Sequence, residues 1–187
     1  MNPLQASMVG FDITPRFHPE HGAWGTTPSV CELDMPLLSR CLVLQQEEQR
    51  VIWFGSDLCG EPVPFTQALR AEVAEALQVN DNQIVWSTSQ THSTGAIPGS
   101  VMSGSAINGR VSIDSPFIEA ERLRFISAFV AAARQAIDQL QPVRVWAGRG
   151  YCDSIGYNSR FPMPNGGSKF SRHYAEGLQS GKFYDPA

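Results

Sequence analysis

The sequence predicts an α/β protein, close to the α+β class, in which two amphipathic helices cover a mixed β-sheet and long Gly/Pro-rich loops surround it. Three observations favour this class. Hydrophobic residues make up 42% of the chain and charged residues 17%, which is typical of a folded core. Short apolar runs alternate with two stretches of helical periodicity. Glycine and proline cluster outside these elements, in residues 15–36, 94–109 and 148–187.

The first predicted elements are strands. Residues 8–15 form an apolar run that Pro15 should stop, because proline has no N–H for the ladder. Residues 16–36 show no periodicity and predict a long loop. The apolar runs 37–44 and 50–55 flank a polar stretch, and this arrangement predicts an antiparallel hairpin.

Two helices are predicted from apolar residues spaced three or four apart. The stripe of the first is Phe65, Leu69, Val73 and Leu77, and a strand over 83–88 follows it. The second helix begins at Pro116, a good first-turn residue, and runs to about Leu140. Its predicted core stripe is Leu123, Ile126, Val130, Ala133 and Ile137. Glu119, Arg122 and Arg124 are predicted on the solvent-exposed face.

The last predicted strand covers 143–148, where apolar and polar residues alternate. The order β, ββ, α, β, α, β then gives a mixed sheet under two helices. No linker interrupts the chain before about residue 150. We therefore expect 1–187 to form a single domain, with its core over about 8–150 and a loop-rich tail over 151–187.

Charge and hydropathy exclude several partners. The formal net charge of −4 provides no basic field for a phosphate backbone, so nucleic acid is not expected as a partner. No apolar run approaches the roughly 20 residues of a transmembrane helix. The amino end has neither a basic nor an apolar signal region. We expect a cytoplasmic protein by default, or a secreted or periplasmic one if the amino end is incomplete; the oligomeric state is not predicted.

The cysteines and tryptophans are predicted to be structural. The four cysteines are widely spaced without a Cys-x-x-Cys pair, so neither a zinc ribbon nor a dithiol redox motif is indicated. Cys41 and Cys59 lie in apolar runs and are predicted to be small core residues. The tryptophans lie mostly in or beside predicted strands and are expected in the core; they are Trp24, Trp53, Trp86 and Trp146.

The strongest functional signal is Ser89-Gln90-Thr91-His92-Ser93-Thr94-Gly95, directly after the strand predicted over 83–88. α/β enzymes present reactive groups at the carboxyl ends of strands. His92 titrates near neutrality, and its neutral form binds zinc. A histidine here can also cap a loop or bond a buried carbonyl. Ser93 suggests a serine hydrolase, but no Gly-x-Ser-x-Gly elbow is present.

Asp57 is the second candidate site residue, because it ends the strand predicted over 50–55. It could orient His92 or hold a metal through water. It could equally cap the turn before the first helix. The remaining histidines, His18, His21 and His173, are predicted to lie in solvated loops.

Several blocks together resemble the amino-terminal domain of the neutral or alkaline, non-lysosomal ceramidase family. Val9-Gly10-Phe11-Asp12-Ile13-Thr14-Pro15 is similar to the family's opening Gly-x-Ala-Asp-Ile-Thr-Pro. The stretch from Asp34 to Leu44 is similar to its Asp-Pro-Leu-Tyr-Ala-Arg-Ala strand, and the stretch from Ile52 to Leu58 to its strand ending in Ser-x-Asp-Leu. The blocks keep the family's order and spacing over roughly 8–160.

The resemblance implies a function. The family's signature Thr-His-Thr-His-Ser-Gly-Pro corresponds to the stretch that holds His92, and its Asn-Arg-Ser-Pro segment to Asn158-Ser159-Arg160-Phe161-Pro162. The implied activity is hydrolysis of the amide of an N-acyl sphingoid base, a small-molecule lipid, by zinc-activated water. His92 and Arg160 would be catalytic, with Ser93 and Asp57 binding substrate; a match shifted by one residue places Ser159 in the position of Arg160.

The chain departs from the family at one metal ligand. Gln90 stands where the signature has its first ligand histidine, so the metal positions of this segment are Gln90 and His92. A neutral amide is a poor zinc donor. The family's other ligands lie downstream of the matched segment, so we expect a partial domain that is inactive or nearly so alone. The alternative is a zinc-free homologue that binds lipid or glycan without catalysis. A metal-free serine or cysteine hydrolase, using Ser93 or Cys59, is a third class.

Overall fold

The computed structural model describes residues 2–18, 22–23, 35–58, 63–91, 116–152, 160–162 and 166–170. The chain divides into two compact units, Met1–Arg144 and Val145–Ala187. In the second unit, β8 (Arg160–Pro162) pairs antiparallel with β9 (Ser168–Phe170). The expectation of one domain over 1–187 stays a prediction.

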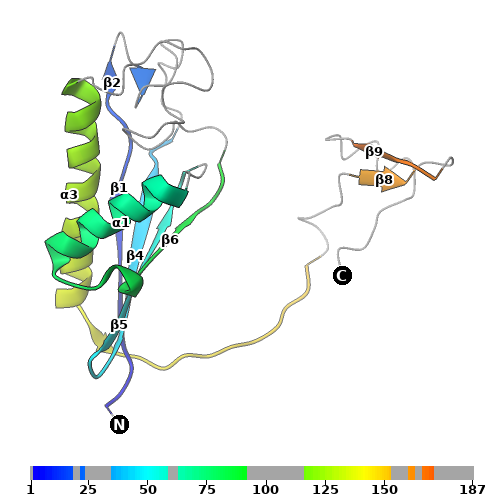
Figure 1. Cartoon of the computed structure of the whole chain (residues 1–187). Coiled ribbons are helices and arrows are strands. Elements are labelled where there is room, and N and C mark those ends of the chain that lie inside the picture. Colours follow the sequence, from blue (N-terminus) through cyan, green and yellow to red (C-terminus); the bar gives the residue numbers. More distant parts are fainter. Residues whose placement is uncertain are drawn as a thin grey trace. The chain divides into compact units, whose positions relative to one another are not determined.

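The first unit is built on a five-stranded mixed sheet of order β6-β5-β4-β1-β7 (Figure 1). Its strands are β1 (Gln5–Asp12), β4 (Leu38–Gln46), β5 (Gln49–Ser56), β6 (Ile84–Thr88) and β7 (Gln141–Pro142). Only the β5–β6 pair is parallel. The predicted mixed sheet and hairpin are therefore confirmed, with the hairpin turning at Glu47 and Glu48.

Both helices pack on one face of this sheet. α1 (Val63–Leu77) joins the parallel strands β5 and β6, which need a crossover connection, and a short 3₁₀ turn, η1 (Asp81–Gln83), leads into β6. α3 (Pro116–Asp138) contacts α1, β1 and β4. Figure 1 shows α1 crossing the strands and α3 running along them. The two predicted helices over one mixed sheet are thus confirmed.

The core lies between the helices and this inner face of the sheet, and Phe129 is at its centre. The Phe129 ring lies 4.9 Å from the ring of Phe54 on β5, 4.3 Å from that of Trp86 on β6 and 4.5 Å from that of Phe125. Phe11 of β1 meets it edge-on at 4.9 Å. One aromatic residue therefore contacts three strands and its own helix.

The buried face of α3 is centred differently from the predicted stripe. Leu123 is 50% exposed, whereas Phe125 and Phe129 are fully buried. Glu121 is also buried, on the side of the helix where the sequence predicts no core. The prediction for Leu123 is wrong because the charged pair Glu121 and Arg124 is drawn inward by polar partners on the β1 side, which rotates Leu123 outward.

The strand predicted over 143–148 is not formed. β7 ends at Pro142, and only the Val143 N–H continues the pairing, to Leu4 O at 2.9 Å. No described strand pairs with residues 144–148, so the apolar side of this alternating segment has no sheet to bury it. These residues are exposed, and Trp146 is 87% exposed.

β1 ends at Asp12, three residues before Pro15, and the loop predicted over 16–36 holds two short strands, β2 (Phe17–His18) and β3 (Gly22–Ala23).

Trp86 packs in the core, but Trp53 is 45% exposed, so the core prediction fails for Trp53 and Trp146. Trp24 lies outside the described residues.

An ion-pair network joins the two helices at the surface. Arg122 of α3 donates to both carboxylate oxygens of Glu72 on α1, at 2.8 and 2.7 Å, and also bonds Glu119. The hydrogen bond from Arg122 lowers the pKa of the Glu119 carboxyl. Both acids are well exposed, so the network adds little stability and chiefly sets how the helices lie against each other.

Truncation of Phe129 tests this core. Phe129→Ala should lower the free energy of unfolding by about 3–5 kcal/mol, because it opens a cavity under three strands. Leu123→Ala, on the same helix but half exposed, should cost less than about 1 kcal/mol. Urea titration of the full chain, followed by circular dichroism, measures both. Equal losses of unfolding free energy in the two variants would contradict the observed orientation of α3, with Phe129 towards the sheet and Leu123 towards solvent.

Candidate functional site

Polar side chains gather at the edge of the sheet where β1, β5 and β6 end and β4 begins. The register places Asp12 opposite Leu38, and Ser39 opposite Ser56, which in turn lies opposite Thr88. The pairing runs one step further, since the Ser89 N–H donates to Ser56 O at 3.0 Å. We call this group the polar edge; it consists of Asp12, Thr14, Ser56, Asp57, Ser89 and Gln90.

Asp57 closes the ladder between β4 and β5. Its N–H donates to Leu38 O at 2.9 Å, and its Oδ2 accepts from the Leu38 N–H at 3.2 Å. Its other oxygen, Oδ1, accepts no bond from the described residues. Asp57 therefore fixes the edge with one oxygen.

Buried hydroxyls lie beneath the polar edge. Ser39 Oγ and Ser56 Oγ are 2.9 Å apart, and the Trp86 Nε1–H donates to Ser56 Oγ at 3.1 Å. Both serines are buried. Because these groups satisfy one another, the strands keep polar residues next to the apolar core without an unpaired donor.

Gln90 turns the chain where β6 has ended. Its backbone has φ 57°, in the left-handed region that residues other than glycine seldom adopt. The residue is exposed, and its amide makes no hydrogen bond to any residue in the described part of the chain. The backbone thus changes direction at the position where the signature of the resembling family has a metal-binding histidine.

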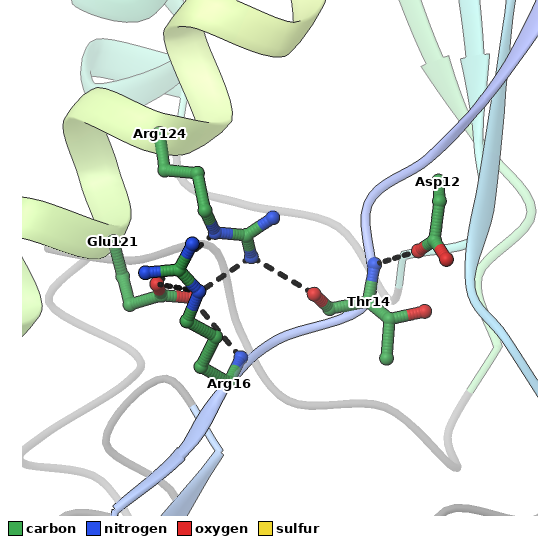
Figure 2. A network of polar contacts seen from close by, with 5 residues as sticks. All are labelled: Asp12, Thr14, Arg16, Glu121 and Arg124. Carbon is green, nitrogen blue, oxygen red and sulfur yellow. Dashed lines mark hydrogen bonds and ion pairs between the residues drawn. The ribbon is translucent and has the colours of Figure 1, made fainter.

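The connection from β1 is held against α3 by a buried carboxylate (Figure 2). Glu121, with a side chain only 2% exposed, accepts bonds from Arg124 at 3.0 and 2.8 Å and from the Arg16 N–H at 3.1 Å. Arg124 also donates to Thr14 O at 2.8 Å. The carboxylate is thus paired with Arg124 and hydrogen-bonded to the backbone, as burial of a charge requires.

The same connection is bonded to the sheet. Asp12 Oδ1 accepts from the Thr14 N–H at 2.6 Å, as Figure 2 also shows, and Thr14 Oγ1 accepts from the Leu37 N–H at 2.9 Å. The Asp12-Ile13-Thr14 turn therefore links the end of β1, the start of β4 and helix α3. Sequence reasoning missed this role for Thr14 and Glu121. The three-residue spacing of Glu121 and Arg124 was the available signal, but it is equally typical of exposed helix pairs.

The predicted site residues fall in three places. Asp57 and Gln90 lie together at the polar edge, at the ends of the parallel strands β5 and β6. His92 and Ser93 lie outside the described residues. Arg160 begins β8 in the second unit, where it is exposed and lies opposite Phe170.

The described residues do not assemble a metal centre. Within the described ranges, no three His, Cys, Asp or Glu residues are grouped so as to hold an ion. Asp12 and Asp57 each use one oxygen to accept a backbone N–H, and Gln90 offers a neutral amide. Cys41 is confirmed as a core residue, and burial raises the pKa of its thiol to about 12, so it is no nucleophile.

A pocket of about 530 Å³ lies at the other end of the sheet, away from the polar edge. Arg50 at the start of β5, the end of α1 and the end of α3 line it. Its charged groups have mixed sign, with Glu75 and Asp138 near Arg50 and Arg134. Neither Asp57 nor Gln90, the predicted site residues of the first unit that are described, lines this pocket.

Among the described helices, none combines the length and the hydrophobicity that a membrane span requires.

The fold is shared with ceramidases of known structure. A ceramidase complexed with C2 superposes with a TM-score of 0.53 at 17% identity, and the match covers 75% of this chain and 22% of that one. Neutral ceramidase from Pseudomonas aeruginosa superposes with a TM-score of 0.50 at 16% identity, with the same coverage. The likeness inferred from short blocks is confirmed at the level of the fold.

The extent of the match is limited. This chain corresponds to about 22% of the length of those ceramidases. No protein-family model and no curated protein matches the sequence.

Replacement of Glu121 tests the anchoring of the polar edge. Glu121→Gln keeps the shape but removes the charge that Arg124 and Arg16 share, so it should cost about 1–3 kcal/mol of unfolding free energy. Glu119→Gln, two residues earlier and exposed, is the matched control and should change it by less than about 0.5 kcal/mol. Urea midpoints at neutral pH give both values. Similar effects of the two replacements would show that the buried carboxylate does not anchor the connection.

Proposed function

We propose that this chain contributes part of the active site of a ceramidase-like hydrolase, which cleaves the amide of an N-acyl sphingoid base or a similar linear amide. The polar edge supports the proposal most directly. Residues from three sequence blocks that resemble the ceramidase family come together there: Thr14, Asp57 and Gln90. The fold adds support, because it is similar to that of a part of two ceramidases of known structure.

His92 is assigned to the reacting end of the substrate. It follows Gln90, a residue of the polar edge, by two positions in the sequence. In hydrolysis, a water oxygen adds to the amide carbon, the C–N bond breaks and the departing nitrogen takes up a proton. An imidazole is suited to carry that proton near neutral pH.

The other assignments rest on chemistry and on the resemblance. Arg160 is assigned to the carbonyl oxygen, where negative charge develops, because its guanidinium offers a fork of donors. Asp57 and Ser93 are assigned to polar groups of the substrate. In the resembling family, zinc lowers the pKa of the attacking water towards about 7. The described residues do not form a zinc site, so no step above is derived from the metal.

A second candidate function is a zinc-free homologue that binds a lipid or glycan without cleaving it. Gln90 is the observation that favours it. The amide replaces an imidazole at a ligand position, and it stands exposed on a left-handed backbone, free of bonds to described residues. Such a protein would keep the polar edge for recognition and lose hydrolysis.

Zinc content and amide hydrolysis distinguish the two functions. We expect the longest polypeptide that the gene encodes to release fatty acid from a short-chain ceramide. His92→Ala should abolish the release, and Arg160→Ala should lower it about 10²-fold, the size expected when a donor to the developing charge is lost. A folded protein that binds the ceramide without cleaving it would overturn the hydrolase and support the binding homologue.

A ligand-restoring variant tests the metal position in the 187-residue chain. Gln90→His should tighten zinc binding about tenfold or more, measured by calorimetry with zinc alone. Gln78→His is the matched control, because Gln78 is also exposed with φ 56° but directly follows α1, away from the polar edge. Equal affinity for zinc in both variants would contradict the assignment of position 90 to a metal site.

A further inference from the structure

The pocket of about 530 Å³ lies where both helices end, at the opposite end of the sheet from the polar edge. Glu75, two residues before the end of α1, and Asp138, the last residue of α3, line it. Arg50 of β5 and Arg134 of α3 line it as well. Two carboxylates and two guanidiniums therefore surround one hollow, and their formal charges sum to zero.

The two carboxylates stand where helices disfavour them. The last carbonyl groups of a helix carry partial negative charge, so a basic side chain is favourable in the last turn and an acidic one is not. Neither α1 nor α3 has a basic residue in its last turn, and each has an acid there, Glu75 and Asp138. Proteins break local rules of this kind at functional sites.

Arg50 also stands at an unusual position. It occupies the inner face of β5, two residues before the buried Ile52, and it is half-buried beneath the helix ends. Most positions on this face are apolar and pack against the helices. A charged residue here weakens the core edge and gives the pocket a cation instead.

One hydrogen bond positions each arginine at the pocket. The Arg50 Nε–H donates to Gln45 Oε1 at 2.8 Å, and Arg134 Nη2 donates to Ala76 O at 2.8 Å, at the end of α1. Within the described ranges, no ion pair joins either arginine to Glu75 or Asp138. Charges of opposite sign thus line the pocket without neutralising each other directly.

We propose that this pocket binds a small zwitterion, with a carboxylate at one end and an ammonium at the other. Arg50 and Arg134 suit the carboxylate, because a guanidinium fork matches its two oxygens. The two acids and the negative ends of both helices suit the ammonium. Leu77 and Ile137, which also line the pocket, suit an aliphatic spacer between the two charges.

The balance of charge selects a zwitterion over a simple ion. An anion alone would lie beside Glu75 and Asp138, and a cation alone beside Arg50 and Arg134, and such like-charge contacts disfavour binding. The volume also exceeds the needs of a single ion, since pockets for small molecules span roughly 300–1,000 Å³. The inference is independent of the proposed function.

Nuclear magnetic resonance titration of the full chain with 6-aminohexanoate tests the site. The amides of Gln78 and Asp138 should shift with a Kd in the millimolar range or below, whereas that of Ser89, at the polar edge, should not. Hexanoate and hexylamine are the matched control ligands, because each keeps the aliphatic chain and only one of the two charges. Both should bind about tenfold more weakly or less.

Replacement of Asp138 separates a binding role from a structural one. Asp138→Asn removes an acid from a helix end, so it should raise the urea midpoint slightly while weakening 6-aminohexanoate binding about fivefold or more. Glu119→Gln is the matched control, because it removes an acid from the first turn of the same helix, where an acid is favourable. It should not raise the midpoint and should leave the Kd unchanged. Arg50→Gln should weaken binding about tenfold.

Three results overturn the proposal. The first is no shift of the Gln78 and Asp138 amides at up to about 50 mM 6-aminohexanoate. The second is binding of hexanoate or hexylamine as tight as that of the zwitterion. The third is an unchanged Kd in both Asp138→Asn and Arg50→Gln, or a lower urea midpoint in Asp138→Asn, since the acid would then serve the fold.

Discussion

The buried carboxylate of Glu121 is the polar group on which the account of this fold depends, because among the described residues it is the charged side chain that is buried. A charge in the interior has to be paired and hydrogen-bonded, and here Arg124 and the backbone and side chain of Arg16 meet that demand. Because Arg124 also bonds Thr14 O, the first connection after β1 is drawn onto α3. The phase of α3, with Phe125 and Phe129 towards the sheet and Leu123 outward, is set together with this contact.

The polar edge follows from that anchor. Thr14 Oγ1 accepts a hydrogen bond from the Leu37 N–H, and Asp57 Oδ2 accepts one from the Leu38 N–H. The start of β4 is therefore bonded to the end of β1 and to the end of β5. β6 then ends beside Ser56 and turns at Gln90. Residues far apart in the sequence thus form a shared rim. The proposed function takes this rim as one wall of a substrate site.

Periodicity and turn chemistry predicted most of the sheet and both helices, because alternation and three-to-four spacing report which side of an element faces the core. They failed where a tertiary contact decided the outcome. Leu123 fits the predicted apolar stripe of α3 but is half exposed, whereas the charged Glu121 is buried. The alternation in 143–148 is typical of a strand, but no described strand pairs with residues 144–148, which are exposed.

For the site, the position of Asp57 and Gln90 at strand ends was predictable, because the carboxyl ends of parallel neighbours meet at one edge. Their binding roles, like those of His92, Ser93 and Arg160, stay predictions. The bonds that hold the edge were not predictable, because spacing alone does not show which charged pair of a helix turns inward.

Amide hydrogen exchange at the polar edge tests the account most directly. The N–H groups of Arg16, Leu37 and Leu38 are bonded to Glu121, Thr14 and Asp57. If these side chains hold the edge together, the three amides should exchange nearly as slowly as that of Val43 in the centre of β4. Exchange at the rate of an unprotected loop, while Val43 stays protected, would contradict a pre-assembled edge.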